Sequence, residues 1–348
     1  MTHEPDLRQS IREVLLRDLN KEARAFQKLK GGRNSQVFRV DCADGSVFAA
    51  KAYFQPVQDQ RDRLGTEFRA LQFLKSEGVR QIAVPVAADE ARRVAVYEFV
   101  AGETLRAGEI GDADIDQAVE FLRALKTIAD SGQASHLPAA SEACFSIAAI
   151  LENLDVRLRR LDKASAQQPA LADFLRNELT PCRQLAEQRC RELCRKHGIA
   201  PDADISLSER TLSPSDFGFH NALRGASGQL VFVDFEYFGW DDPAKTVADF
   251  LLHPGMQLPP TLKQSFFSSM VTAFAGVPEL GRRVSAVHPL FGLKWCAILL
   301  NEFTLEDRAR RCFANEAKGA WDERVQLDRA RRMLAHVIND DRDFSWHS

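Results

Sequence analysis

The sequence predicts an α+β protein in which strands come first and helices follow. Apolar patterns typical of strands occur up to about Val100, after a short helix near Leu7 to Leu19. From Asp112 onward, amphipathic patterns typical of helices dominate. The 348 residues, 45% of them apolar, suffice for one large domain or two. We expect two lobes, an N-terminal one over residues 1–100 and a helical one over residues 101–348.

A turn-rich segment precedes the first clear strand, which we expect at Val37 to Val40. Such a loop can close over phosphates with its backbone N–H groups, but Gly-Gly before a strand is also an ordinary hairpin entry. It is not a Walker A loop, which needs GxxxxGK[ST] at the start of a helix. The candidate phosphate-binding residues of this segment are Gly31, Gly32, Asn34 and Ser35.

A lysine and a glutamate stand on faces that are otherwise apolar. Lys51 interrupts the predicted strand Val47 to Phe54, and Glu67 falls on the apolar stripe of a predicted helix from Arg61 to Glu77. A buried charge needs an opposite charge nearby. We therefore predict a Lys51–Glu67 ion pair, the alternative being two side chains that extend to the surface.

Further along, an Asp is followed by an Asn five residues later and by a second Asp thirteen beyond that. These are Asp216, Asn221 and Asp234, the last at the end of the apolar run Leu230 to Val233. Alone, each is ordinary in a turn or at a strand end. Together they suit phosphoryl transfer, in which one carboxylate accepts a hydroxyl proton and oxygen ligands hold Mg²⁺.

In this order, the Gly-rich hairpin, strand Lys, helix Glu, Asp-x4-Asn loop and strand-ending Asp resemble the aminoglycoside phosphotransferase and choline kinase-like family. These enzymes are small-molecule relatives of protein kinases. The resemblance covers about Phe26 to Leu252 and is looser beyond. It implies a bilobal protein-kinase-like fold, with a small antiparallel-sheet N-lobe and a larger, mainly helical C-lobe.

The resemblance also implies roles for single residues and the cofactors ATP and Mg²⁺. Lys51 would orient the phosphates with Glu67 as its partner, and Asp216 would be the catalytic base. Asn221 and Asp234 would be the magnesium ligands. The remaining nucleotide-binding positions would be the hairpin residues Gly31, Gly32, Asn34 and Ser35, and the adenine-reading hinge from Glu98 to Val100.

The chain departs from the family directly before the predicted base. The family usually has His two residues before the catalytic Asp and Gly one before, whereas this chain has Pro214 and Ser215. The departure affects the geometry of the loop more than its chemistry. It leaves open a second hypothesis, a nucleotide-binding pseudokinase with a regulatory or scaffold role.

The acceptor is expected to be a small molecule with a hydroxyl group. Only seven residues separate Asp234 from Asp242, which with Pro243 predicts a helix start and leaves little room for a peptide platform. This argues against a protein kinase and favours a sugar, an amino alcohol or an aminoglycoside-like metabolite. Candidate acceptor-pocket residues are Glu236, Asp241, Asp249, Lys294, Trp295, Asn301, Glu302 and Glu306.

Composition excludes several other classes. A net charge of −3 predicts neither a nucleic acid nor an anionic membrane as partner. The polar start and the lack of a long apolar run predict a cytoplasmic protein, and seven cysteines without a CxxC pair fit a reducing compartment. Cys190, Cys194 and His197 share a helix face, but buried thiols explain them better than a metal.

Further helices are expected at 147–161, 171–194, 261–275, 288–303 and 321–337.

Overall fold

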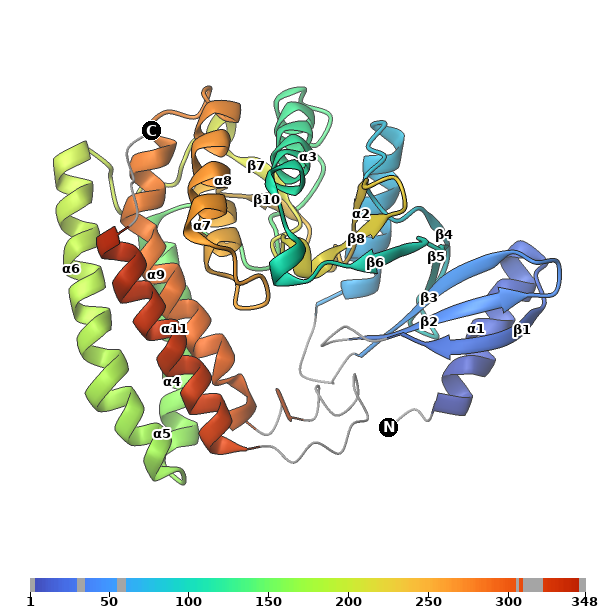
Figure 1. Cartoon of the computed structure of the whole chain (residues 1–348), viewed down its shortest axis with the longest axis horizontal. Coiled ribbons are helices and arrows are strands. Elements are labelled where there is room, and N and C mark those ends of the chain that lie inside the picture. The colour runs from blue at the N-terminus through green and yellow to red at the C-terminus, as the bar shows by residue number, and fades with distance from the viewer. Residues whose placement is uncertain (1–3, 30–34, 55–60, 305–306, 309–321, 344–348) are drawn as a thin grey trace. The chain divides into compact units, whose positions relative to one another are not determined.

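The computed structural model describes residues 4–29, 35–54, 61–304, 307–308 and 322–343 (Figure 1). These residues form two compact units. The first contains Met1–Thr104 and Asn221–Phe238, and the second contains Leu105–His220, Gly239–Leu305 and the helix at the C-terminal end. The first unit is therefore discontinuous in sequence, because a segment from the middle of the chain returns to it.

The first unit is built on a five-stranded antiparallel sheet with the strand order β1-β2-β3-β5-β4. Helix α1 precedes this sheet in the sequence, and helix α2 lies between β3 and β4. The bounds are α1 Glu4–Leu19, β1 Ala23–Lys28, β2 Ser35–Cys42, β3 Val47–Tyr53, α2 Arg63–Ser76, β4 Pro85–Asp89 and β5 Val94–Glu98. The expected N-terminal helix and the strands around Val37, Lys51 and Val94 are confirmed.

Helix α1 supplies one side of the hydrophobic core of this unit. Ile11, Val14 and Leu15 are fully or almost fully buried and cluster with Phe38 and Val40 of β2. Each such side chain contributes about 1.5–3 kcal/mol through the apolar surface it removes from water. This packing makes the sheet a firm support for the polar residues that it carries.

A second, three-stranded sheet joins the returning segment to the rest of the first unit. Its strands are β6 Gly102–Thr104, β8 Ala222–Gly225 and β9 Leu230–Phe232, in the order β6-β8-β9. Phe232 also donates its backbone N–H to the carbonyl of Gln81 at 2.8 Å. These bonds place the residues just after β9 in the same unit as β3 and α2.

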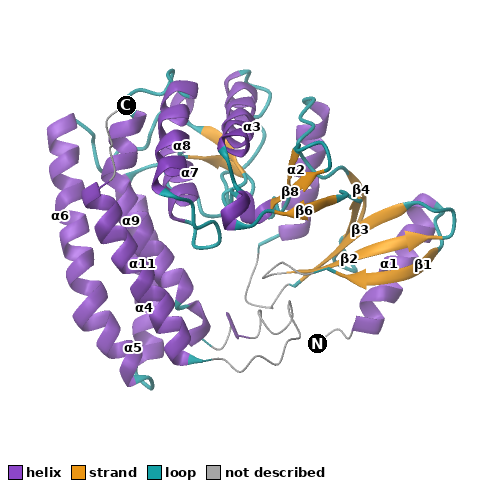
Figure 2. Cartoon of the chain, viewed as in Figure 1, coloured by secondary structure: helices purple, strands orange, loops and turns teal. Residues whose placement is uncertain are grey.

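The second unit is mainly helical, as Figure 2 shows by colour. Two short strands, β7 Thr211–Ser213 and β10 Gly239–Asp241, pair with each other. The helices are α3 Asp112–Asp130, α4 Ile147–Ser165, α5 Pro169–Phe174, α6 Thr180–His197, α7 Pro243–Leu252, α8 Pro260–Ala273, α9 Leu280–Leu299 and α11 Glu323–Asp343. A π-helical turn, Leu175–Leu179, connects α5 and α6.

Most helix predictions are confirmed here, including the start of α7, where the Asp242 side chain accepts from the N–H of Ala244. Helix α9 begins at Leu280, eight residues before the predicted start at His288, and runs through Pro289. Within the part of the chain that the structure describes, one segment, Leu280–Phe303, is long and apolar enough to cross a membrane by length and composition. Because 83% of its most apolar 18-residue stretch is buried in the structure, this segment forms the core helix of the unit.

The buried thiols on α6 behave as the sequence suggested. Cys190 and Cys194 are each 1% exposed, and burial raises the pKa of Cys190 to about 12. Burial also raises the pKa of Cys194. Both thiols are therefore protonated near neutral pH, as is typical of buried cysteines that serve in packing.

Helices α9 and α11 approach closely at Gly292. A Cβ atom at this position would overlap the side chain of Val337 on α11. At Gly281, by contrast, the nearest atoms to an added Cβ belong to Phe267 and Val271 at 3.5 Å, an ordinary contact. The two glycines of α9 therefore differ in the space around them.

We predict that Gly292→Ala lowers the thermal unfolding midpoint. Alanine in a helix normally gains about 1 kcal/mol over glycine, but overpacking against Val337 costs about 1–3 kcal/mol. Gly281→Ala is the control and should leave the midpoint unchanged or raise it. Unfolding followed by far-UV circular dichroism makes the comparison, and equal midpoints for both variants would contradict the close packing.

Candidate active site

Lys51 lies in the middle of β3 with only 8% of its side chain exposed. Its Nζ donates to Glu67 Oε2 on α2 and to Asp234 Oδ1 just after β9, each at 2.6 Å. The predicted Lys51–Glu67 ion pair is thus confirmed. Asp234, predicted as a magnesium ligand, is a second anionic partner of the same ammonium, and all three residues belong to the first unit.

The charges of this cluster support one another. Burial would lower the pKa of Lys51, but the Asp234 and Glu67 carboxylates raise it well above its ordinary value. The ammonium is therefore charged at any physiological pH. The ammonium offsets only one of its two carboxylate partners, so these three side chains keep one negative charge, which a cation bound by Asp234 would offset.

Two tyrosines complete the setting of Glu67. The Tyr53 hydroxyl donates to Glu67 Oε2 at 2.7 Å and lies 2.7 Å from the Tyr97 hydroxyl. Burial raises the pKa of both phenols, so they remain hydrogen-bond donors. Sequence reasoning missed this pair, although Tyr53 stands two residues after Lys51 and hence on the same face of β3.

The segment after β9 has a constrained backbone. Asp234 has a φ of 70°, in the left-handed region that side chains other than glycine rarely occupy. The N–H of Val233 donates to the carbonyl of Asn221 at 2.9 Å, so the two predicted magnesium ligands lie on adjoining strand ends. Strain of this kind costs about 1–3 kcal/mol and is concentrated at functional sites.

Glu236 adds a further carboxyl group to this part of the first unit. It is 3% exposed and lies 3.7 Å from Nε of Arg63. Burial and the Asp234 carboxylate raise the pKa of Glu236 to about 7, and Lys51 opposes this shift. Near neutral pH, a larger fraction of Glu236 is therefore protonated than of an ordinary glutamate.

The other predicted nucleotide-binding residues are partly described. Ser35 is buried at the start of β2, and Glu98 ends β5 and donates its N–H to the carbonyl of Val84 at 2.9 Å. Val100 follows that strand with an intermediate exposure. Gly31, Gly32 and Asn34 lie outside the described residues.

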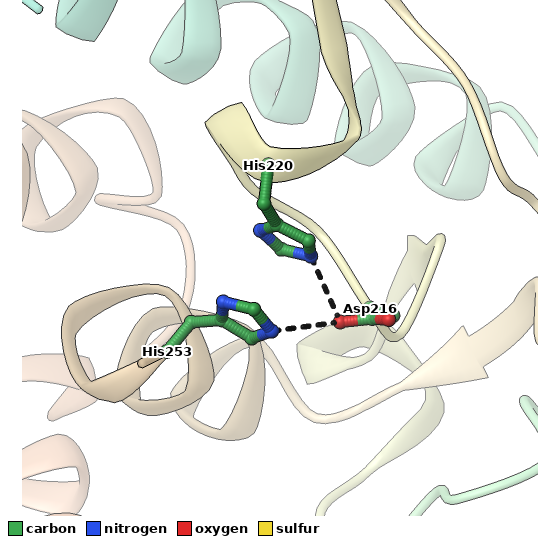
Figure 3. A group of neighbouring side chains, drawn as sticks. All are labelled: Asp216, His220 and His253. Atoms are coloured by element: carbon green, nitrogen blue, oxygen red, sulfur yellow. Dashed lines mark hydrogen bonds and ion pairs between the residues drawn. The ribbon is translucent and has the colours of Figure 1, made fainter. Parts of the chain in front are cut away.

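Asp216 lies in the second unit, in the loop after β7. Its carboxylate Oδ1 is 3.1 Å from Nε2 of His220 and 3.5 Å from Nε2 of His253, which follows α7 (Figure 3). Its side chain is 35% exposed, against 16% for His220 and 13% for His253. The two imidazoles hold the carboxylate in place and solvent can reach it, which is the geometry required of a positioned base.

The loop is anchored by its aromatic residues. Phe217 and Phe219 are buried, and both rings contact Phe250 of α7, with ring centroids 5.8 and 5.4 Å away. Phe217 also stacks on Phe121 of α3 at 5.6 Å. The alternation of buried phenylalanines with Asp216 and His220 turns the polar side chains to one side of the loop.

Ser215, one of the two residues that depart from the family pattern, has a φ of 67°. Glycine adopts this conformation without strain, which explains why glycine is usual at this position. Here the backbone N–H of Ser215 donates to Ser213 Oγ at 3.0 Å, and Lys245 Nζ donates to Ser215 Oγ at 2.9 Å. These bonds stabilise the strained residue.

Among the described residues, Asp216, His220 and His253 are the one group with the composition of a metal site. The geometry disfavours that interpretation. The two imidazole rings are stacked, with centroids 3.5 Å apart and planes 7° apart, so their in-plane lone pairs run parallel and do not converge on one ion. In both histidines, Nε2 instead faces the same carboxylate oxygen, Asp216 Oδ1.

The carboxylates proposed to capture a cationic acceptor are already paired. Asp241 and Asp249 both contact Lys245, at 2.6 and 3.4 Å. Asp249 also accepts hydrogen bonds from Lys294 and Trp295. Glu302 accepts a hydrogen bond from Gln326, Glu236 belongs to the first unit, Asn301 begins a short 3₁₀ turn, and Glu306 lies outside the described residues.

Comparison with known proteins gives the class of the fold and then the family. A buried lysine on an antiparallel sheet, paired with a glutamate on the following helix and accompanied by a mainly helical second unit, describes a protein of the kinase-like fold class. The family model described as "Phosphotransferase enzyme family" matches residues 25–269, and the chain belongs to this family. A comparison with curated proteins found no match.

Solved structures with the same fold span nearly the whole chain. A choline kinase from Streptococcus pneumoniae is 13% identical, with 96% of this chain and 99% of that chain covered and a TM-score of 0.59. An ethanolamine kinase from Plasmodium vivax is 14% identical, with 97% and 89% covered and a TM-score of 0.59. A spectinomycin phosphotransferase in complex with ADP and spectinomycin is 14% identical, with 93% and 98% covered and a TM-score of 0.58.

These findings confirm two predictions from the sequence. The fold is kinase-like, and the family is one of phosphotransferase enzymes. The roles of individual residues remain predictions that rest on the geometry described above.

We predict that Ser215→Gly is more stable than Ser215→Ala. Both variants lose the hydrogen bond from Lys245, but only alanine keeps a Cβ atom at a positive φ, which costs about 1 kcal/mol. Chemical denaturation of the two variants measures the difference directly. If the alanine variant proved equally stable or more stable, backbone strain at Ser215 would not be what glycine relieves.

We predict that Lys51→Met destabilises the protein by about 3–5 kcal/mol, because it leaves the buried Glu67 carboxylate without its cation. Adding Glu67→Gln to this variant should restore part of the loss, since the neutral amide keeps a partner for Tyr53. Urea unfolding of wild type, both single variants and the double variant gives the coupling energy. Simple additivity of the two single effects would contradict the ion pair.

Proposed function

We propose that this protein transfers the γ-phosphoryl group of ATP to a hydroxyl group of a small molecule. The observation that carries the proposal is the buried Lys51 ammonium, held at 2.6 Å from both Glu67 and Asp234 in a chain of the phosphotransferase family. Phosphoryl transfer requires chiefly positioning and cancellation of phosphate charge. A preorganised ammonium beside a metal-type carboxylate suits that requirement.

Under this proposal, the first unit binds the nucleotide. Lys51 contacts the phosphates, and the segment that contains Gly31, Gly32, Asn34 and Ser35 covers them. The backbone from Glu98 to Val100 binds the adenine. The neighbours solved with ADP and with AMP support a nucleotide site in this fold.

Asn221 and Asp234 fit a magnesium ion. Both offer oxygen atoms, which Mg²⁺ prefers, and Mg²⁺ takes few ligands from a protein when it also binds substrate phosphates. The hydrogen bond between the Val233 N–H and the Asn221 carbonyl supports this assignment because it joins the two backbone segments. When bound, the ion would neutralise charge on the phosphates.

In the second unit, we assign Asp216 as the base that accepts the proton of the acceptor hydroxyl. Its partly exposed carboxylate and its two imidazole neighbours support this role. Proton transfer by a positioned carboxylate contributes about 10²–10⁴-fold to a rate.

For the acceptor we propose a sugar, an amino alcohol or an aminoglycoside-like metabolite. The relatives of the same fold are named for choline, ethanolamine and spectinomycin. Asp241 and Asp249 are each held by a buried lysine, so they are poor candidates for capturing a cationic group. An acceptor panel should therefore contain neutral sugars beside the amino alcohols and aminoglycosides.

The second candidate function is a nucleotide-binding pseudokinase with a regulatory or scaffold role. Pro214 and Ser215, which replace the usual His and Gly, favour it. The pairing of Lys51 with Glu67 and the contacts of Asp216 with His220 favour catalysis instead.

We also infer a cytoplasmic location, which fits the free thiols of the described cysteines.

The test is acceptor-dependent release of ADP from Mg-ATP across that panel. We expect Asp216→Asn to lower turnover by about 10²–10⁴-fold, because an amide cannot accept the proton. Binding of Mg-ATP should be unchanged in this variant, since its nucleotide-binding residues are intact. Asp234→Ala should weaken Mg-ATP binding as well.

Turnover at the wild-type rate in Asp216→Asn would overturn the role given to Asp216. Nucleotide binding without ADP release for any acceptor would favour the pseudokinase. Calorimetric titration of ATP with and without Mg²⁺ separates these results from simple loss of folding.

A further inference from the structure

We propose that His253 is a positioning residue that fixes the rotation of the Asp216 carboxylate through a hydrogen bond from Nε2–H to Oδ1. The proposal rests on the proposed function for its effect on turnover, but the hydrogen bond itself does not. His253 comes from the end of α7, far in sequence from the Asp216 loop, and both belong to the second unit. Four sets of contacts support it.

The tautomer of His253 is set by its own turn. The backbone N–H of Gly255 donates to His253 Nδ1 at 3.1 Å, so this nitrogen is the acceptor and the ring hydrogen belongs to Nε2. Nε2 lies 3.5 Å from Asp216 Oδ1. The neutral ring is thus a donor toward the carboxylate and has no lone pair at Nε2 to offer a metal.

Residue 255 must be small for this turn to form. An added Cβ atom would lie 3.0 Å from Cε1 and 3.1 Å from Nδ1 of His253, and 3.3 Å from Cβ of His220. Such distances are shorter than nearly all real contacts of a Cβ atom. The close approach of backbone to ring is what orients Nε2 toward the Asp216 loop.

The ring is held on its other sides by aromatic side chains. One face stacks on His220, with centroids 3.5 Å apart, and Trp295 of α9 meets it edge to face at 4.5 Å. Trp295 is fixed in turn, because its Nε1 donates to Asp249 Oδ1 at 2.9 Å. His253 therefore has little freedom to rotate away from Asp216.

The consequence for catalysis is geometric. His220 Nε2 and His253 Nε2 both approach Oδ1, the same oxygen of Asp216. Two donors on one oxygen restrict rotation of the carboxylate about its last side-chain bond, a torsion that is otherwise broad. A base held in one orientation needs less reorganisation when the acceptor hydroxyl arrives.

Two substitutions separate the hydrogen bond from the packing. His253→Phe keeps an aromatic ring against His220 and Trp295 but removes the donor. His253→Gln removes the ring but keeps an N–H donor of similar reach. His136→Gln, at an exposed position in the same unit, is the matched control for a histidine loss and should change neither turnover nor stability.

We expect His253→Phe to lower kcat at least about tenfold while the KM for ATP changes less than about threefold, because the base is misoriented and nucleotide binding is untouched. His253→Gln should retain kcat within about threefold. The opposite order, with the Phe variant active and the Gln variant impaired, would show that His253 acts through aromatic packing alone and would overturn the proposal.

A spectroscopic test requires no turnover. In ¹⁵N-labelled wild-type protein, imidazole correlation spectra should show His253 as the neutral Nε2–H tautomer, with its resonances assigned by their loss in His253→Gln. Asp216→Ala should shift the His253 Nε2 resonance, because the acceptor is gone. An Nδ1–H tautomer, or a resonance unaffected by Asp216→Ala, would overturn the proposal.

The same spectra distinguish failure of this proposal from failure of the proposed function. If no acceptor is phosphorylated but the Nε2 resonance responds to Asp216→Ala, the hydrogen bond stands and the kinase assignment falls. Titration of the wild-type protein with Zn²⁺ is the final comparison. Loss of the Nε2–H signal at equimolar Zn²⁺ would identify a metal site instead and would overturn the positioning role.

Discussion

The first unit depends on how the buried charge of Lys51 is compensated. An ammonium removed from water is costly unless it is paired, and the cost is largest where one partner is missing. Here the ammonium contacts two carboxylates, Glu67 from α2 and Asp234 from the segment after β9. The charge therefore links the sheet, the helix and the returning segment of the first unit. The strained backbone of Asp234 is held within the same set of contacts.

The contacts of this cluster differ in how well the sequence predicts them. The Lys51–Glu67 pair was predictable because each residue is an anomaly in a local apolar pattern, and the two anomalies have opposite charge. The bond from Lys51 to Asp234 spans 183 positions and has no local signature. The alternation of side chains along β3 predicts that Tyr53 lies on the same face as Lys51. Its contact with Tyr97 depends on the pairing of β3 with β5, which has no local signature in the sequence.

The second unit shows the same division. Asp216, the helix start at Asp242 and most helix positions follow from motif spacing and capping chemistry, which are local. His253 follows α7, and only tertiary packing brings it to Asp216. The predicted start of α9 at His288 is too late. Proline is commonest at the first helical position, whereas Pro289 lies inside this helix. The sequence shows Ser215 as a departure from the family, but only its positive φ explains why glycine is usual at this position.

The second unit also contains a buried lysine between two carboxylates. Lys245 is 1% exposed and contacts Asp241 and Asp249, and these carboxylates raise its pKa although burial alone would lower it. Through Ser215 this lysine supports the backbone before Asp216, and through Asp249 and Trp295 it is connected to the ring of His253. Each unit therefore organises its own polar residues around its own buried lysine. The contacts described for Lys51 lie within the first unit and those described for Asp216 lie within the second, so nucleotide binding and proton acceptance can be tested as separate properties of the chain.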